Sequence, residues 1–290
     1  MRRQVREGRF LIEDLLKAAV LGVVQGLTEF LPVSSTGHLI LAEKAMGVDQ
    51  DRYGLSFDAA LHMGTLLALL LYFGMTWVRM AAGGLRTIST RSMADPDGRL
   101  AWLIVLGTIP AAAIGFALQS KIEDTFRSPF LVATMLILFS GVFLIAEAVA
   151  TRRRTLQDLT WADSLIVGLA QAIALVPGVS RSGSTICAGL FRDIERPDAA
   201  RFAFLLSAPI IAGAGGKQML HVAKQFADGK LGGDDAAFFA TGFVLAAIVG
   251  YASVAFLMRF LTTNSLRPFV YYRIGLGLLV YAVLLAQAFV

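Results

Sequence analysis

The 290-residue sequence is poor in charged residues and almost free of cysteine. Only 16% of its residues are Asp, Glu, Lys or Arg, below the roughly 25% of an ordinary soluble domain. The single cysteine, Cys187, cannot form an intramolecular disulfide, and its place in an apolar segment favours packing over redox chemistry. These shortages exclude an internal disulfide framework and an ordinary soluble globular protein.

Hydrophobic residues are abundant instead, at 56% of the chain with a mean hydropathy of +0.67. Such a composition predicts an integral membrane protein. The net charge of +5 comes mostly from arginines in short loops and in the N-terminal tail, so it bears on membrane topology and predicts no nucleic-acid partner. The basic N-terminus resembles a signal peptide, but the following apolar run leads directly into a polar motif, and we expect it to be retained.

Two polar motifs interrupt the apolar chain. The first reads QGLTEFLPVSSTGH from Gln25 to His38, and the second reads PGVSRSGST from Pro177 to Thr185. Charges and unpaired hydroxyl groups at membrane depth cost several kcal/mol unless they have partners. Each motif therefore predicts a functional site.

The two motifs belong to an internal repeat. A shift of 146 residues aligns seven identical pairs: Gly22 with Gly168, Gln25 with Gln171, Val33 with Val179, Ser34 with Ser180, Gly37 with Gly183, Ile40 with Ile186 and Ala42 with Ala188. The reactive positions differ: Glu29 aligns with Leu175, Ser35 with Arg181 and His38 with Ser184. One copy thus supplies an acid, a hydroxyl and an imidazole, and the other supplies the cation.

Each motif lies between two short apolar segments. The first segment, residues 11–31, stops at Pro32, and Ser34 is suited to cap a second helix over residues 36–46. Because a full span needs about 20 apolar residues, the two short legs predict a hairpin that dips into the membrane and returns to the same side. Residues 161–176 and 182–191 predict a second hairpin of the same kind.

Three membrane spans are expected after each hairpin. They cover residues 55–78, 100–118 and 129–150 in the first half, and residues 201–222, 236–260 and 268–289 in the second. An odd number of crossings inverts the second half, which would bring the two polar tips together near the membrane midplane. The predicted fold is therefore an all-α polytopic membrane protein with one domain over residues 1–290, built from an inverted repeat of about 11–150 and about 160–290.

Arginines in the connections set the expected orientation. One side bears Arg86, Arg91, Arg99, Arg152, Arg153, Arg154, Arg192, Arg196, Arg259 and Arg267. The positive-inside rule makes this side cytoplasmic and places both termini outside. The basic tail argues for the opposite orientation through Arg2, Arg3, Arg6 and Arg9.

The first motif offers several kinds of chemistry. Gln25 and Glu29 are spaced i, i+4 and share one helix face. Glu29 could hold a divalent cation, act as a general acid or base, orient an imidazole, or form a structural pair with an arginine. The hydroxyls of residues 34–36 suit helix capping or catalysis, and His38 is spaced i, i+3 from Ser35, within reach to take a proton from Ser35 or from water.

The second motif has the features of a phosphate site. Small residues surround Arg181, a helix start supplies free N–H groups, and the guanidinium is a planar fork for phosphoryl oxygens. A structural ion pair with Glu29 is the alternative, and both are compatible if the pair forms only in the empty site. Asp58 and His62, also spaced i, i+4, either support the site or lie at the membrane edge.

Together the two motifs closely resemble the bacterial undecaprenyl-diphosphate phosphatases linked to bacitracin resistance. The resemblance covers nearly the whole chain. It implies hydrolysis of undecaprenyl diphosphate to the monophosphate and inorganic phosphate, which recycles the lipid carrier for peptidoglycan and other envelope glycans. It also implies an inverted-repeat fold in the bacterial cytoplasmic (inner) membrane, a site open to the outer face and, in some members, a homodimer.

The resemblance also implies residue roles. Glu29 is the second acid of a Glu/Gln-x-x-x-Glu signature, Ser35 and His38 are nucleophile and base, and Arg181 is the phosphate clamp. Expected substrate-binding residues are Gln25, Ser34, Thr36, Gly178, Ser180, Ser182 and Thr185. Gln25 is a departure because many members have Glu there, and Gln cannot ionise, which weakens any role that needs two carboxylates.

Several alternatives stay open at this point. Attack by water or by His38 competes with attack by Ser35. A divalent cation, Mg²⁺ or Ca²⁺, held at Glu29 is a candidate cofactor, and no organic cofactor is expected. A polyprenyl-phosphate transporter or flippase is the alternative function, since paired broken helices in inverted repeats are a transporter architecture. The Ser35–His38 pair favours the enzyme, because transport of a headgroup does not need it.

Overall fold

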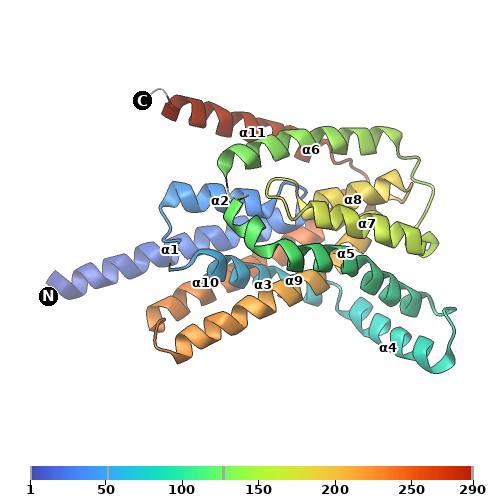
Figure 1. The fold of residues 1–290 in the computed structure, drawn as a ribbon, viewed down its shortest axis with the longest axis horizontal. Helices are drawn as coiled ribbons and strands as arrows, with labels where there is room; N and C mark the ends of the chain where they lie inside the picture. Colours follow the sequence, from blue (N-terminus) through green and yellow to red (C-terminus); the bar gives the residue numbers. More distant parts are fainter. Residues whose placement is uncertain (1, 51, 126–127, 289–290) are drawn as a thin grey trace.

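A computed structural model of the chain describes residues 2–50, 52–125 and 128–288. Over these residues the fold consists of eleven α-helices and one short 3-10 helix, η1 (Leu156–Asp158), and no strand is formed beyond an isolated bridge between Arg154 and Ile194. The helices run broadly along the long axis of the molecule (Figure 1). The predicted all-α class is confirmed.

The first hairpin consists of α1 (Arg2–Phe30) and α2 (Ser35–Met46). The break falls at Pro32 as predicted, but the first leg is not short: α1 has 29 residues, about 44 Å at 1.5 Å per residue. The predicted cap at Ser34 is wrong. Ser34 has a φ of 76° and its side chain makes no capping hydrogen bond to α2, because its hydroxyl bonds across to the second hairpin.

The second hairpin consists of α7 (Trp161–Ile173) and α8 (Arg181–Phe191). Ser180, the repeat partner of Ser34, has nearly the same φ of 78°, and here the hydroxyl does cap the helix, accepting from Gly183 N at 3.2 Å. The two hairpins enter the molecule from opposite ends of its long axis, and their tips meet in the middle (Figure 1).

The segment after the first hairpin differs from the prediction. The expected span over residues 55–78 is two helices, α3 (Gly54–Tyr72) and α4 (Gly74–Thr90), which are separated at Phe73. The apolar run continues past this break through Val78, so composition gave no sign of it. Helix α4 exposes Met75 and Leu85 and leads to α5 (Pro96–Thr125).

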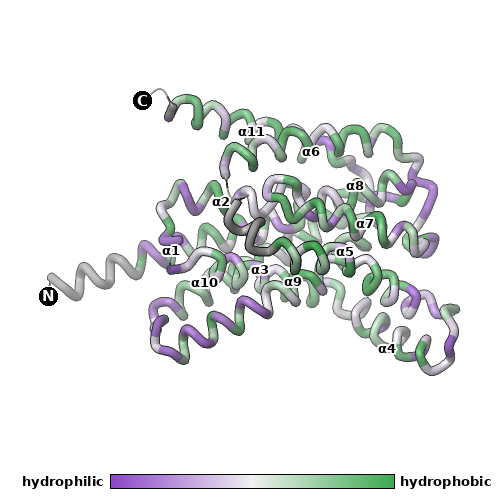
Figure 2. The backbone as a smooth tube through the Cα atoms, in the orientation of Figure 1, coloured by the Kyte–Doolittle hydropathy of each residue, from purple (hydrophilic) through white to green (hydrophobic). Residues whose placement is uncertain are grey.

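The remaining spans agree with the prediction apart from their ends. They are α6 (Pro129–Val149), α9 (Arg196–Ala227), α10 (Gly233–Phe260) and α11 (Arg267–Ala288). Within the described ranges, six helices are long and apolar enough to cross a membrane: α3, α5, α6, α9, α10 and α11. Figure 2 shows that hydrophobic residues follow these helices and that hydrophilic residues gather toward the ends of the molecule. The prediction of three spans after each hairpin is therefore confirmed by length and composition.

The two halves of the chain interlock. Helix α1 packs on α10 where a Cβ atom added to Gly22 would lie 2.7 Å from the carbonyl oxygen of Gly242, and α7 packs on α5 where a Cβ atom on Gly168 would overlap the backbone of Gly107. Gly22 and Gly168 are aligned by the 146-residue shift. Each hairpin thus packs closely on a helix from the other half, and only glycine permits this approach.

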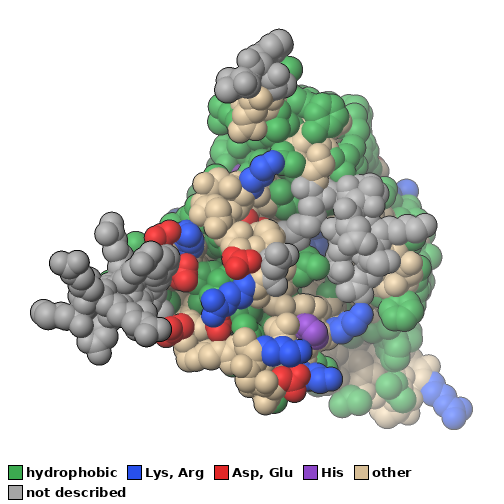
Figure 3. All heavy atoms as spheres, turned by 60° about the vertical axis from the view of Figure 1, so that its left-hand side comes forward, with side chains coloured by type: hydrophobic (Ala, Val, Ile, Leu, Met, Phe, Trp, Pro, Cys, Tyr) green, Lys and Arg blue, Asp and Glu red, His purple; other side chains and the backbone are tan. Residues whose placement is uncertain are grey.

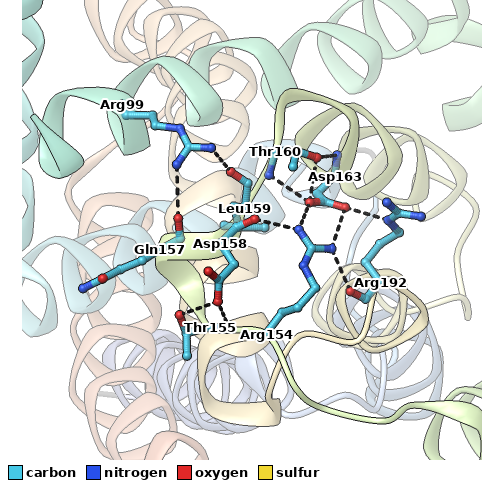
Figure 4. A network of polar contacts seen from close by, with 9 residues as sticks. All are labelled: Arg99, Arg154, Thr155, Gln157, Asp158, Leu159, Thr160, Asp163 and Arg192. Carbon is cyan, nitrogen blue, oxygen red and sulfur yellow. Dashed lines mark hydrogen bonds and ion pairs between the residues drawn. The ribbon is translucent and has the colours of Figure 1, made fainter. Parts of the chain in front are cut away.

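The ten arginines that the sequence analysis assigned to the cytoplasmic side gather at one end of the molecule. The α4–α5 and α6–α7 connections lie at the end that faces right in Figure 1, and both termini lie at the left. Figure 4 shows the network there: Arg99 donates to the Gln157 and Leu159 carbonyls, and Arg154 and Arg192 pair with Asp163. The side chains of Arg2, Arg3, Arg6 and Arg9, predicted to favour the opposite orientation, lie outside the described side chains.

Candidate active site

Glu29, in the last turn of α1, is the centre of the polar cluster. It is 6% exposed. Its Oε2 atom accepts from Ser35 Oγ at 2.6 Å and from Gln25 Nε2 at 3.1 Å, and its Oε1 atom pairs with the guanidinium of Arg181 at the start of α8. These donors offset the cost of burying a carboxylate. The structure thus brings Glu29, Ser35 and Arg181 together, as the sequence predicted.

His62 on α3 also faces Glu29. Its Nε2 atom lies 3.5 Å from Glu29 Oε2, and its Nδ1 atom lies 2.7 Å from the backbone oxygen of Asp58 in its own helix. Because a carbonyl only accepts, Nδ1 carries a proton and Nε2 is the atom presented to Glu29. Of the two interpretations of His62, the structure supports the one that places it at the site.

The predicted pair of Ser35 and His38 does not form. His38 Nδ1 lies 2.7 Å from the Ser34 oxygen, and its Nε2 lies 2.8 Å from the hydroxyl of Tyr272 on α11, whose ring stacks against the imidazole. The hydroxyl of Ser35 points to Glu29 instead. The i, i+3 spacing allows a contact between the two residues, but the imidazole of His38 binds Tyr272 on α11 instead.

A cavity of about 300 Å³ adjoins this cluster. Its polar lining comes from both hairpins and from α3 and α9: Ser34, Ser35, Thr36, Asp58, His62, Gln171, Ser180, Arg181 and Gln218. Leu55, near the start of α3, and Gln218, in the second half of α9, also line it, so the cavity extends from the hairpin tips toward the end that carries the termini (Figure 1). A second cavity of about 290 Å³ at that end shares Leu55 with the first.

Only three of the seven expected substrate-binding residues line the cavity: Ser34, Thr36 and Ser180. The other four serve the hairpins themselves. Gln25 Nε2 donates to Glu29 Oε2. Ser182 Oγ donates to the Leu31 oxygen at 3.2 Å, and Thr185 Oγ1 donates to the Arg181 oxygen at 2.7 Å. Gly178 N donates to Ser34 Oγ at 3.1 Å, which joins the two tips. Four of the seven predicted residues thus hold the hairpins together, and which of the seven bind substrate stays a prediction.

Arg273 on α11 is a site residue that the sequence reasoning missed. It is fully buried, and its guanidinium donates to the Gly178 oxygen at 2.9 Å and to the Pro32 oxygen at 3.4 Å. Pro32 and Gly178 are aligned by the 146-residue shift, so one side chain bridges the same carbonyl of both tips. Among the described residues no carboxylate pairs with it, and the ring of Phe143 lies 4.7 Å from its charge. An arginine inside the last apolar run was the available signal.

The described residues do not form a metal site by themselves. No group of three or more His, Cys, Asp or Glu side chains within them could hold a metal ion. Both carboxylate oxygens of Glu29 already accept hydrogen bonds or pair with Arg181. A cation at Glu29 would need most of its ligands from another source.

Comparison with known proteins shows the family of the chain. The family described as bacitracin resistance protein BacA matches residues 18–279. The chain is 49% identical over 273 residues to an undecaprenyl-diphosphatase of Rubrobacter xylanophilus, covering 94% of this chain and 99% of that protein. It is 44% identical to an undecaprenyl-diphosphatase of Pelobacter propionicus, covering 94% and 98%, and 42% identical to one of Renibacterium salmoninarum, covering 93% and 96%. The chain belongs to the bacitracin resistance protein BacA family.

Proposed function

We propose that this protein is a membrane phosphatase that hydrolyses undecaprenyl diphosphate to undecaprenyl phosphate and inorganic phosphate, and so recycles the lipid carrier for cell-wall synthesis. The observation that carries the proposal is the meeting of Ser35, Glu29 and Arg181 beside a cavity between the two hairpins. The names of the relatives support the same substrate. A flippase would need the cation but not a hydroxyl bonded to a carboxylate, so transport is the weaker alternative.

Arg181 is the proposed phosphate clamp. In the free protein it pairs with Glu29, and a diphosphate that enters the cavity offers it more acceptor oxygens in a bidentate arrangement. Because Arg181 is the first residue of α8, the free N–H groups and the positive end of that helix point to the same region. Exchange of Glu29 for phosphate would leave the carboxylate free to accept a proton.

Ser35 is the proposed nucleophile. Its Oγ attacks the terminal phosphorus while its proton passes to Glu29 Oε2; the Oγ–P bond forms, the bond from phosphorus to the bridging oxygen breaks, and undecaprenyl phosphate leaves. Glu29 passes this proton to the leaving undecaprenyl phosphate. Water then attacks the phosphoserine and gives a proton to the Glu29 carboxylate, the Oγ–P bond breaks, and Ser35 Oγ takes the proton from Glu29 as inorganic phosphate is released. The 2.6 Å hydrogen bond between Ser35 and Glu29 supports this route over attack by His38, whose two ring nitrogens both have other partners.

The two histidines receive different roles. His62 exchanges protons with Glu29, because its Nε2 atom lies 3.5 Å from the carboxylate, Nδ1 carries the ring proton, and the ring lines the cavity. His38, predicted as the base, is instead a positioning residue that fixes α2 against α11 through Tyr272.

A divalent cation, Mg²⁺ or Ca²⁺, stays a prediction. In phosphate chemistry Mg²⁺ is usually held by one or two carboxylates together with substrate phosphates. Glu29 is the candidate carboxylate here, and the diphosphate would supply the other oxygens. When bound, the cation would neutralise phosphate charge.

A homodimer also stays a prediction, which a mass measurement of the detergent-solubilised protein would check.

We further propose that the cavity faces the outside of the cytoplasmic membrane and that the fold is an inverted repeat. The gathering of arginines at the opposite end supports the orientation by the positive-inside rule. Figure 3 turns the end with the termini forward and shows acidic and basic side chains intermingled there. Hairpins that enter from opposite ends, and the matching glycine contacts of Gly22 and Gly168, support the inverted repeat.

The test is phosphate release from undecaprenyl diphosphate by purified protein in detergent, with and without a chelator. Wild type is compared with Glu29→Ala and with Ser253→Ala, a buried serine of α10 outside the site. Activity that is lost in Glu29→Ala and kept in Ser253→Ala supports a phosphatase with its site at the first hairpin. No release by wild type under varied cations and lipids would reject the proposal in favour of lipid transport.

A further inference from the structure

Gln171 on α7 is a buried amide without a partner. It is 2% exposed, and among the described residues neither its Oε1 nor its Nε2 atom has a hydrogen-bond partner. It lines the 300 Å³ cavity together with Ser180 and Arg181. A buried amide that forms no hydrogen bond destabilises the free protein, so a native structure that keeps one calls for an explanation.

The internal repeat explains why this amide is unpartnered. The aligned residue of the first hairpin, Gln25, donates from its Nε2 atom to Glu29, one helical turn later. One turn after Gln171 the chain has Leu175, which offers no acceptor. Among the described residues neither Oε1 atom has a partner, so the two hairpins differ at Nε2, which is bonded in Gln25 and unbonded in Gln171.

The surroundings of Gln171 favour an anionic ligand. Arg181 and the N-terminal end of α8 make this part of the cavity positive, and Ser180 adds a hydroxyl. A neutral amide donor beside a cation is suited to a phosphoryl oxygen that the guanidinium leaves open. An apolar lipid chain would leave the amide as unsatisfied as it is in the free protein.

We propose that Gln171 is a substrate-binding residue whose Nε2 atom donates to a non-bridging oxygen of the diphosphate beside Arg181. This inference rests on the proposed function for the identity of the substrate. It assigns the second hairpin two contacts to the headgroup, one charged and one neutral. The first hairpin then carries the reacting groups.

The inference predicts that one substitution lowers activity without lowering stability. In Gln171→Leu the unsatisfied amide is gone, so the thermal unfolding midpoint of the free protein should stay equal to or rise above that of wild type. Its kcat/KM for undecaprenyl diphosphate should fall about 10- to 100-fold, as expected for a lost hydrogen bond to a charged group. In the matched variant Gln25→Leu, both the midpoint and kcat/KM should fall, because the Nε2 atom of Gln25 already donates to Glu29.

Gln171→Met repeats the test with an unbranched side chain. Ser184→Ala is a control: it removes a buried hydroxyl between α7 and α8 and so reports how a weaker contact within this hairpin affects stability and activity. A lower midpoint in both Gln171 variants, including failure to fold, would show a structural amide and overturn the inference. Unchanged kcat/KM in a stable Gln171→Leu would also overturn it.

A binding measurement separates this inference from the proposed function. Inorganic pyrophosphate is added to wild type and to Gln171→Leu, and the rise of the unfolding midpoint is recorded. Greater protection of wild type supports the contact even if wild type hydrolyses no lipid diphosphate, a result that would reject only the proposed function. Equal protection of the two proteins, including none, overturns the contact whatever the activity.

Discussion

Glu29 and Arg181 form an ion pair between the tips of the two hairpins although 152 positions separate them in the chain. The carboxylate is almost fully buried, and the guanidinium borders the cavity. A buried pair of this kind costs desolvation energy, and breaking it strands one charge. Any event at the site that breaks this pair, such as phosphate binding to Arg181, therefore also changes the contact between the two hairpin tips.

Arg181→Ala should lower kcat/KM about 100- to 1,000-fold, because it removes a charged donor from the developing phosphoryl charge. Arg181→Lys keeps the charge but loses the planar fork, and should recover only part of the activity. Phosphate release from undecaprenyl diphosphate measures both. Near-normal turnover by Arg181→Ala would disprove the clamp.

Ser35→Ala should abolish turnover, since the proposed phosphoserine cannot form. Wild type quenched with acid during turnover should carry one phosphate on a peptide containing Ser35, detected by mass spectrometry. Ser253→Ala is the control, because its hydroxyl bonds only within α10. Full activity of Ser35→Ala, with no phosphopeptide in wild type, would favour direct attack by water.

The two histidines should respond differently to substitution. His62→Ala removes the group facing Glu29 and should lower kcat about 100-fold, and His62→Gln should not restore it, because an amide cannot exchange a proton with the carboxylate. His38 acts through Tyr272, so Tyr272→Phe should reproduce the loss seen in His38→Gln. The comparison uses kcat over a range of pH. If His38→Gln is inactive while His62→Ala and Tyr272→Phe keep full activity, His38 is the base and the proposed roles are wrong.

Arg273→Met should lower both the thermal unfolding midpoint and kcat, because the carbonyls of Pro32 and Gly178 lose their shared donor and each unpaired buried group costs about 1–3 kcal/mol. Arg273→Lys keeps one charge but cannot bridge two carbonyls, so it should restore the midpoint only in part. Unfolding in detergent and phosphate release are measured on the same samples. A Met variant with wild-type stability and rate would contradict the bridge.

Asp163, at the start of α7, makes the arginine-rich end of the protein sensitive to pH. Burial would raise the pKa of this carboxyl, but hydrogen bonds from Arg154, Arg192 and Thr160 outweigh burial and hold the pKa well below its usual range. The folded state thus binds fewer protons than the unfolded state. The stabilisation is fully present above the ordinary Asp pKa of about 4 and is lost as the pH falls through the lower folded value.

Asp163→Asn should therefore lower the unfolding midpoint at neutral pH, and the difference from wild type should shrink as the pH falls below about 4. Asp158→Asn is the matched control: this exposed carboxylate caps η1 through Thr155 at the same end, and its loss should matter little. Equal midpoints of wild type and Asp163→Asn at neutral pH would contradict the role of the network.

Local chemistry in the sequence was sufficient for several features. The breaks at Pro32 and at Pro177-Gly178, the three spans after each hairpin and the meeting of Glu29 with Arg181 were all predicted. Each depends on a short stretch of chain: a proline that ends a helix, an apolar run of spanning length, or a charge that needs a partner inside a membrane. The break at Phe73 was missed because the apolar run continues through it.

Side-chain direction was decided by the tertiary structure alone. The spacing of Ser35 and His38 allowed a contact, but the imidazole of His38 instead bonds to Tyr272 on the last helix. The imidazole beside Glu29 belongs to His62 on α3. Arg273 and Gln171 look alike in sequence, as polar residues in apolar runs, yet one is bonded to both hairpin tips and the other is left without a partner. The sequence by itself determined which residue types enter the membrane and where the helices break, because those depend on local polarity and backbone geometry. Which of these residues meet was decided only by the packing of helices distant in the chain, because a hydrogen bond needs its two atoms within about 3 Å.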